Sequence, residues 1–191
     1  MKRHVHDPTV LRAIAHPVRN RILGELSAQG PLRAADLSAE LGVPANQASF
    51  HLRQLAKYGL VEEAVGEGRD RRDRVWRLAD ETGLDLDITE MEKQPGGAAA
   101  AAVFRSQAAG WAHELVDTAY SESRRDGVHR SITDQTLRLT PEEARALTEE
   151  LSDVLNAWVR RTRGRDPERL TYSYLAMLQP LPDQRAKTDD A

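Results

Sequence analysis

Residues 44–61, PANQASFHLRQLAKYGLV, place polar and basic side chains at helical spacing. At about 3.6 residues per turn, one face carries Ala45, Ala48, Leu52 and Leu55. The other face carries Asn46, Ser49, Phe50, Arg53 and Lys57, and Gln47 lies with Asn46 at the start. No carboxylate occurs in the segment. Because amide, hydroxyl and guanidinium groups hydrogen-bond to base edges, and phosphate repels carboxylates, the pattern predicts a DNA-recognition helix over 44–58.

Three helical patterns precede this segment. Asp7 and Pro8 begin the first, which breaks at His16 because a proline follows. A second helix begins there and is closed by Gly30, and a third covers about 33–41. Only Gly42 and Val43 separate the third helix from Pro44, which suits a first helical position. So short a connection predicts a helix-turn-helix, in which the second helix enters the major groove.

A β-hairpin is predicted immediately after the recognition helix. Residues 60–65 and 74–78 are rich in apolar, β-branched and aromatic side chains, and GEGRDRRD at 66–73 connects them. A hairpin after a recognition helix makes a winged helix. The wing residues 66–74 are expected to contact the DNA backbone or a narrow minor groove through four guanidinium groups. These are Arg69, Arg71, Arg72 and Arg74.

Charge divides the chain into two parts. Residues 1–79 hold 13 Lys and Arg against 9 Asp and Glu, whereas residues 80–191 hold 14 against 21, for a net charge of −3. A basic part can bind DNA while an acidic part lies on its far side, because salt screens charges beyond about 8 Å. Charge and patterning therefore predict a winged helix-turn-helix domain at 1–79, a linker at 80–97 and a C-terminal dimerisation or effector domain at 98–180.

The C-terminal part is predicted to be a smaller α/β domain with a long helix. That helix covers about 98–123 and carries a stripe of Phe104, Ala108, Trp111, Leu115 and Ala119. Another helix begins at the capping residue Thr140 and ends near Gly164, between extended runs at 131–139 and 170–178. Residues 181–191 are expected to be a disordered tail. The fold class is thus mainly α with a β-hairpin wing.

Several side chains admit a second interpretation. Core or dimer packing is the interpretation of Phe104, Trp111, Leu115 and the helix that carries Trp158, with a small-molecule pocket between the two parts as the alternative. His113 and Asp117 share a helical face and are weak candidates for zinc or nickel, since a metal site needs further ligands. His51 is expected to pack inside the protein, and Phe50 either packs against the wing or contacts DNA.

Four segments in order resemble the ArsR-like winged helix-turn-helix transcription regulators. They are LRAIAHPVRNRIL, AADLSAELGV, ASFHLRQLAKYGLV and GEGRDRRDRVWRL, which cover most of residues 8–79. The resemblance implies a homodimer that binds a palindromic operator and responds to a signal. Metal-sensing members keep cysteines on the helix corresponding to 34–41. This chain has no cysteine, so thiolate sensing of metals is excluded.

The sequence therefore predicts a sequence-specific DNA-binding transcription regulator that is not an enzyme and needs no cofactor. Its partners are double-stranded DNA, a second copy, and a small-molecule or protein effector at the C-terminal domain. Without a signal peptide or 18 consecutive apolar residues, we expect no membrane association and a cytoplasmic location. Two alternatives are a winged helix used as a protein-interaction module without DNA binding, and an enzyme with a metal at His113 and Asp117.

Overall fold

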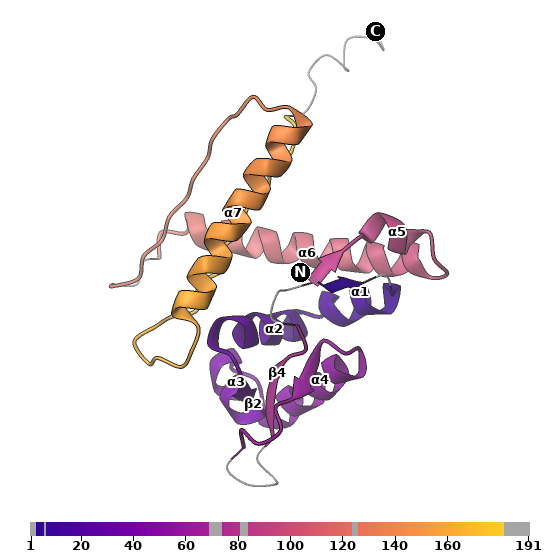
Figure 1. Cartoon of the computed structure of the whole chain (residues 1–191). Coiled ribbons are helices and arrows are strands. Elements are labelled where there is room, and N and C mark those ends of the chain that lie inside the picture. Colours follow the sequence, from indigo (N-terminus) through magenta and orange to yellow (C-terminus); the bar gives the residue numbers. More distant parts are fainter. Residues whose placement is uncertain (1–2, 6, 69–73, 81–83, 124–125, 182–191) are drawn as a thin grey trace.

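The structure is a computed structural model that describes residues 3–5, 7–68, 74–80, 84–123 and 126–181 (Figure 1). Helices dominate. They are α1 (Pro8–Ala15), α2 (Pro17–Gln29), α3 (Ala34–Leu41), α4 (Ala45–Lys57), α5 (Ile88–Glu92), α6 (Gly97–Tyr120) and α7 (Pro141–Thr162). The strands are β1 (Arg3–Val5), β2 (Leu32–Arg33), β3 (Val61–Glu63), β4 (Val75–Leu78) and β5 (Leu84–Leu86). In Figure 1, α2, α3, α4 and β4 cluster together, α6 lies along α1, and α7 stands to one side.

The first two helices begin where the sequence predicts. The Asp7 carboxylate accepts a hydrogen bond from the backbone N–H of Thr9 at 2.8 Å, which caps α1. His16 has an extended backbone and separates α1 from α2, because Pro17 disfavours a helical conformation in the residue before it. The predicted break between these helices is confirmed.

One apolar core joins the first four helices to the wing. Leu11, Ile22, Leu26, Leu32, Leu37, Leu52 and Leu55 are almost fully buried in it. These leucines and isoleucine come from α1, α2, β2, α3 and α4. Burying one such side chain contributes roughly 1.5–3 kcal/mol, so this set fixes α4 firmly against α3 and α2.

The wing is a three-stranded antiparallel sheet in the order β2-β4-β3. Trp76 in β4 pairs with Glu63 in β3 on one side and with Leu32 in β2 on the other. The predicted hairpin is confirmed, and so is the mainly helical winged fold. β2 was not predicted, because two residues after a Gly-Pro pair are too few to show strand alternation.

The acidic segment at 80–97, predicted as a linker, contains β5 and α5 and is packed against the helices. β5 pairs in parallel with β1, and the side chain of Met91 in α5 is completely buried. α5 contacts the start of α6, which in turn crosses α1. The segment therefore holds α6 on the winged domain. The helix predicted over 98–123 is observed as α6.

In the remainder of the C-terminal part, the predicted helix is present as α7 but the two predicted strands beside it are not. α7 begins at Pro141 under a capping box in which Thr140 and Glu143 bond each other's backbone N–H groups, as the sequence suggests. The flanking runs 131–139 and 170–178 do not form strands. A strand requires a hydrogen-bonded partner, and neither run makes a backbone–backbone hydrogen bond with any described residue. The strand-helix-strand part of the expected α/β domain is thus not formed within the single chain.

Candidate nucleic-acid interface

The inner face of α4 is fixed by packing. Ala48, Leu52 and Leu55 are fully buried, while Ala45, which the sequence analysis places on the same face, is exposed. Ala45 is the first residue of the helix, one turn short of the contact with the core. Pro44 is the residue before the helix, with an extended backbone (φ −56°, ψ 142°), and not the first helical position as expected.

The connection from α3 to α4 sets the angle at which α4 projects. Gly42 adopts a left-handed backbone (φ 65°, ψ 30°) that strongly favours glycine. The Ser38 hydroxyl donates a hydrogen bond to the carbonyl of Val43 at 2.7 Å, and the Val43 N–H donates to the Ser38 carbonyl. Both bonds tie the turn to α3. The outer face of α4 is therefore held rigidly.

The outer face carries the side chains that the sequence analysis assigned to DNA. Asn46, Gln47, Arg53 and Lys57 are exposed, Ser49 is half-buried, and Phe50 is 50% exposed. Among the described residues, Arg53 and Lys57 have no ion-pair partner. Two unneutralised cations beside amide groups suit a phosphate-lined groove. The structure thus brings the six α4 candidates together on one helix, exposed to different degrees.

The wing arginines are only partly described. Arg69, Arg71 and Arg72 lie outside the described residues. Arg74 is exposed, and its guanidinium lies 3.7 Å from the carboxylate of Glu63 across the hairpin. Arg77 pairs with Glu62 at 2.7 Å on the same sheet. Since exposed pairs of this kind contribute only about 0–1 kcal/mol, Arg74 can exchange Glu63 for a phosphate at little cost.

His51 is buried behind the outer face, as predicted. Its ring is stacked at a tilt on His16, with 4.5 Å between centroids, and the edge of Phe50 contacts it at 5.3 Å. Burial lowers the pKa of His51, and the charges of His16 and Arg19 lower it further. These surroundings therefore favour the neutral form of the imidazole. One side of Phe50 contacts His51 and half of its surface is exposed, so its contact with DNA stays a prediction.

One ionic cluster was missed by the sequence analysis. Asp36 on α3 accepts hydrogen bonds from the Arg33 side chain at 2.8 and 3.0 Å and pairs with Arg165 at 2.7 Å. These two guanidinium groups hold the pKa of the Asp36 carboxyl far below its usual range, Arg33 being the larger cause. The spacing of Arg33 and Asp36 was visible in the sequence, but Arg165 follows α7 and reaches α3 only through the tertiary structure.

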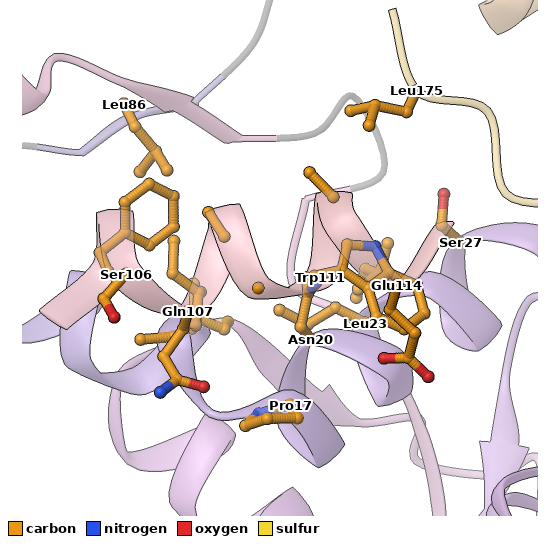
Figure 2. Close-up of a pocket in the computed structure, with 18 of the residues that line it drawn as sticks. Pro17, Asn20, Leu23, Ser27, Leu86, Ser106, Gln107, Trp111, Glu114 and Leu175 are labelled. Carbon is orange, nitrogen blue, oxygen red and sulfur yellow. The ribbon is translucent and has the colours of Figure 1, made fainter. Parts of the chain in front are cut away.

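A pocket of about 650 Å³ lies between the winged domain and α6. Figure 2 shows side chains of α2, such as Leu23, facing Trp111 on α6, with Leu86 and Leu175 above them in this view. Phe104 also lines the pocket, as do Gly59 and Leu60, which lie in the turn between α4 and β3. The aromatic stripe of α6 thus borders a hollow, as the alternative interpretation expected, and the hollow touches the end of α4.

His113 and Asp117 are both exposed on α6. Within the described ranges, no three His, Cys, Asp or Glu side chains lie close enough together to hold a metal ion. This pair therefore gains no third ligand from that part of the chain.

Comparison with known proteins supports the fold of the N-terminal part. A family model described as a helix-turn-helix domain matches residues 14–64, which run from the end of α1 through β3. No curated protein sequence matches the chain. Together with the geometry of α3, α4 and the sheet, the family match shows that the chain contains a winged helix-turn-helix domain.

Solved structures of transcription regulators resemble the chain at low identity. Transcriptional regulator Tm0710 from Thermotoga maritima is 14% identical, with 80% of this chain and 83% of that chain covered and a TM-score of 0.31. Wild-type MarR from E. coli, in the apo form, is 16% identical over 78% and 88%, with a TM-score of 0.34. NMB1585, a MarR family regulator from Neisseria meningitidis, is 17% identical over 81% and 84%, with a TM-score of 0.33.

None of the helices that the structure describes is long and apolar enough to cross a membrane.

Proposed function

We propose that the protein is a sequence-specific DNA-binding transcription regulator of the ArsR-like type, acting as a homodimer on a palindromic operator. The observation that carries the proposal is the outer face of α4, which is exposed, free of carboxylates and braced from behind by three fully buried side chains. A rigid helix with such a face fits the major groove. The basic charge balance of residues 1–79 supports it.

Roles within the interface follow from side-chain chemistry. The guanidinium of Arg53 pairs with the O6 and N7 acceptors of a guanine, and the amides of Asn46 and Gln47 suit adenine. The exposed half of Phe50 contacts a thymine methyl. Ser49 also faces the bases, Lys57 binds at the groove edge, and the wing residues Arg69, Arg71, Arg72 and Arg74 bind phosphates. Each good base contact is worth about 1–3 kcal/mol, so two half-sites are needed for selectivity.

Selection of bound duplexes from a random pool tests the proposal. Enriched sequences should contain two inverted half-sites about one helical turn apart, since two copies of α4 would reach the same side of one duplex. Absence of any enrichment at low salt, with another chain co-purifying, would favour the protein-interaction alternative.

The assignment of Arg53 is tested on the selected duplex. Arg53→Ala should weaken binding to it by about 1–3 kcal/mol and leave binding to random DNA almost unchanged. The matched control is Lys93→Ala, on an exposed side chain directly after α5, which should change the affinity for neither duplex. Arg71→Ala should weaken both duplexes similarly and flatten the salt dependence, because it removes a phosphate contact. Equal losses for Arg53→Ala on both duplexes would contradict direct base readout.

We also propose that the pocket beside α6 receives a small apolar effector. Its volume falls in the range of about 300–1,000 Å³ typical of ligand sites, and its lining is mostly apolar with two aromatic rings. Because Gly59 and Leu60 line it, an occupant would press on the end of α4. An apolar fluorescent probe such as anilinonaphthalene sulfonate should bind, and Ala108→Trp, which fills the pocket, should abolish that binding. Unchanged probe binding by this variant would refute the site.

A further inference from the structure

An exposed apolar surface lies on α7 and the run that follows it. No residue of α7 is buried, although the helix carries Leu151, Val154, Leu155 and Trp158 at exposures of 37–55%. Residues 170–178 are also exposed, with Tyr172 at 58% and Met177 at 70%. A soluble protein rarely leaves a contiguous surface of this kind uncovered.

The spacing on α7 is that of a helix that packs on another helix. Ala144, Leu147, Leu151, Val154 and Trp158 follow one another at alternating steps of three and four residues. This alternation forms the narrow apolar seam of a coiled coil. At about 1.5 Å per residue, the helix is about 33 Å long, enough for three turns on either side of Leu151.

The charges of α7 are divided between its two ends. Residues 141–153 contain five carboxylates and one arginine, whereas residues 154–162 contain two arginines and no carboxylate. A second α7 in antiparallel orientation would place the basic end of each helix beside the acidic end of the other. A parallel arrangement would place like charges together, which is unfavourable. The distribution of charge thus selects an antiparallel copy of the same helix.

We infer that α7 pairs antiparallel with α7 of a second copy around a two-fold axis near Leu151, and that the runs 131–139 and 170–178 complete the same interface. This inference rests on the homodimer of the proposed function and identifies the surface that forms it. With Leu151 on the axis, Ala144 faces Trp158 of the second copy, so that a small side chain meets a large one. Such an interface is self-complementary, as a two-fold axis requires.

The runs 131–139 and 170–178 supply the additional buried area that a single pair of helices lacks. A specific interface buries about 800 Å² on each partner, and a fully covered Trp or Tyr contributes about 150–250 Å². Trp158, Tyr172 and Tyr174 are each more than half exposed, and seven exposed aliphatic side chains surround them. These are Leu151, Val154, Leu155, Leu170, Leu175, Met177 and Leu178. The backbone of 131–139 and 170–178 makes no backbone–backbone hydrogen bond with any described residue, so strands of a second copy have free N–H and C=O groups with which to pair.

Cysteine cross-linking of the full chain tests the inference cleanly, because the natural sequence has no cysteine. Leu151→Cys places one thiol near the axis, and Asn156→Cys places one on the opposite face of α7 as the matched control. Mild oxidation should convert Leu151→Cys into a covalent dimer and leave Asn156→Cys at least tenfold less cross-linked. Equal cross-linking of the two variants would overturn the assigned face.

Orientation is tested by mixing two variants. Leu147→Cys and Leu155→Cys should form mixed disulfides in preference to disulfides between identical chains. The two positions lie about 12 Å apart along the helix, while a disulfide spans about 4.4–6.8 Å between Cα atoms. A preference for identical pairs would overturn the antiparallel arrangement.

Two measurements on the unmodified protein separate this inference from the proposed function. One is sedimentation, and the other is binding to DNA. A dimer that binds DNA but is not cross-linked through Leu151→Cys overturns the α7 interface alone. A monomer at the concentrations at which DNA is bound overturns the interface and the homodimer together. A specific α7 disulfide in a protein that binds no duplex supports the interface and overturns the proposed function.

Discussion

The imidazole rings of His16 and His51 lie 4.5 Å apart between their centroids, where the corner between α1 and α2 meets α4. The Nδ1 atom of each ring is buried without a hydrogen-bond partner among the described atoms. Burial is the main cause that lowers the pKa of both groups, and the charge of Arg19 adds to it. The pair therefore packs well only while both rings are neutral.

Acidification should destabilise the protein through this pair. The unfolded chain binds protons near the ordinary pKa of about 6.5, whereas the folded chain binds them only at lower pH. The free energy of unfolding should be constant above pH 6.5 with respect to these groups and should fall as the pH drops below it. Urea unfolding at pH 8 to 5 measures the effect. His51→Leu should reduce the slope, and the exposed His113→Gln should leave it unchanged; the same slope in His51→Leu would contradict the assignment.

Gly97 and Gly110 should respond oppositely to substitution by alanine, although both lie in α6. A Cβ at Gly97 would sit 1.8 Å from the carbonyl oxygen of Met91, so Gly97→Ala must push α5 away from α6. We expect a loss of about 1–3 kcal/mol or more in the free energy of unfolding. A Cβ at Gly110 meets nothing within 4 Å, so Gly110→Ala should stabilise by up to about 1 kcal/mol. Urea midpoints measure both, and a neutral Gly97→Ala would show that α5 is not held as described.

Asp36→Asn should loosen the contact between α3 and the segment after α7. The substitution keeps the shape of the side chain but removes the negative charge to which Arg33 and Arg165 both bind. Since a hydrogen bond to a charged group contributes about 1.5–3 kcal/mol, we expect a loss of that order. The pKa of Asp36 is lowered, so its contribution is present above the ordinary carboxyl pKa of about 3.9 and is lost as the pH falls below it.

Arg165→Ala separates the two partners of Asp36. It should retain the Arg33 bond and lose less stability than Asp36→Asn, while increasing hydrogen exchange in residues 163–171. A loss equal to that of Asp36→Asn would mean that Arg165, and not Arg33, is the principal partner.

Thr140→Ala should fray the start of α7. The threonine hydroxyl accepts the Glu143 N–H at 3.2 Å, and loss of such a cap costs about 0.5–2 kcal/mol. Thr148→Ala is the matched control, because Thr148 lies inside the same helix and alanine favours helix there. Hydrogen exchange of residues 143–147 should accelerate in the first variant and not in the second. Equal rates in both would show that the cap does not limit fraying.

Local sequence determined the winged domain almost completely. Leu52 and Leu55 recur at helical spacing, Gly42 and Gly59 allow the positive φ angles that end α3 and α4, and Pro17 separates α1 from α2. Each signal acts within a few residues, so periodicity and capping reveal it without knowledge of the remaining chain. The exposed face of α4 follows from the same spacing, because a helix that buries one stripe must expose the opposite one.

Only the tertiary structure decided how distant segments meet. No local pattern indicated that Met91 would be buried, that Arg165 would reach Asp36, or that His16 would stack on His51. It also suggested strands at 131–139 and 170–178 that a single chain does not pair. Side-chain periodicity reports which face a segment hides, but the identity of the surface that covers it depends on contacts between residues far apart in sequence, or on another copy of the chain.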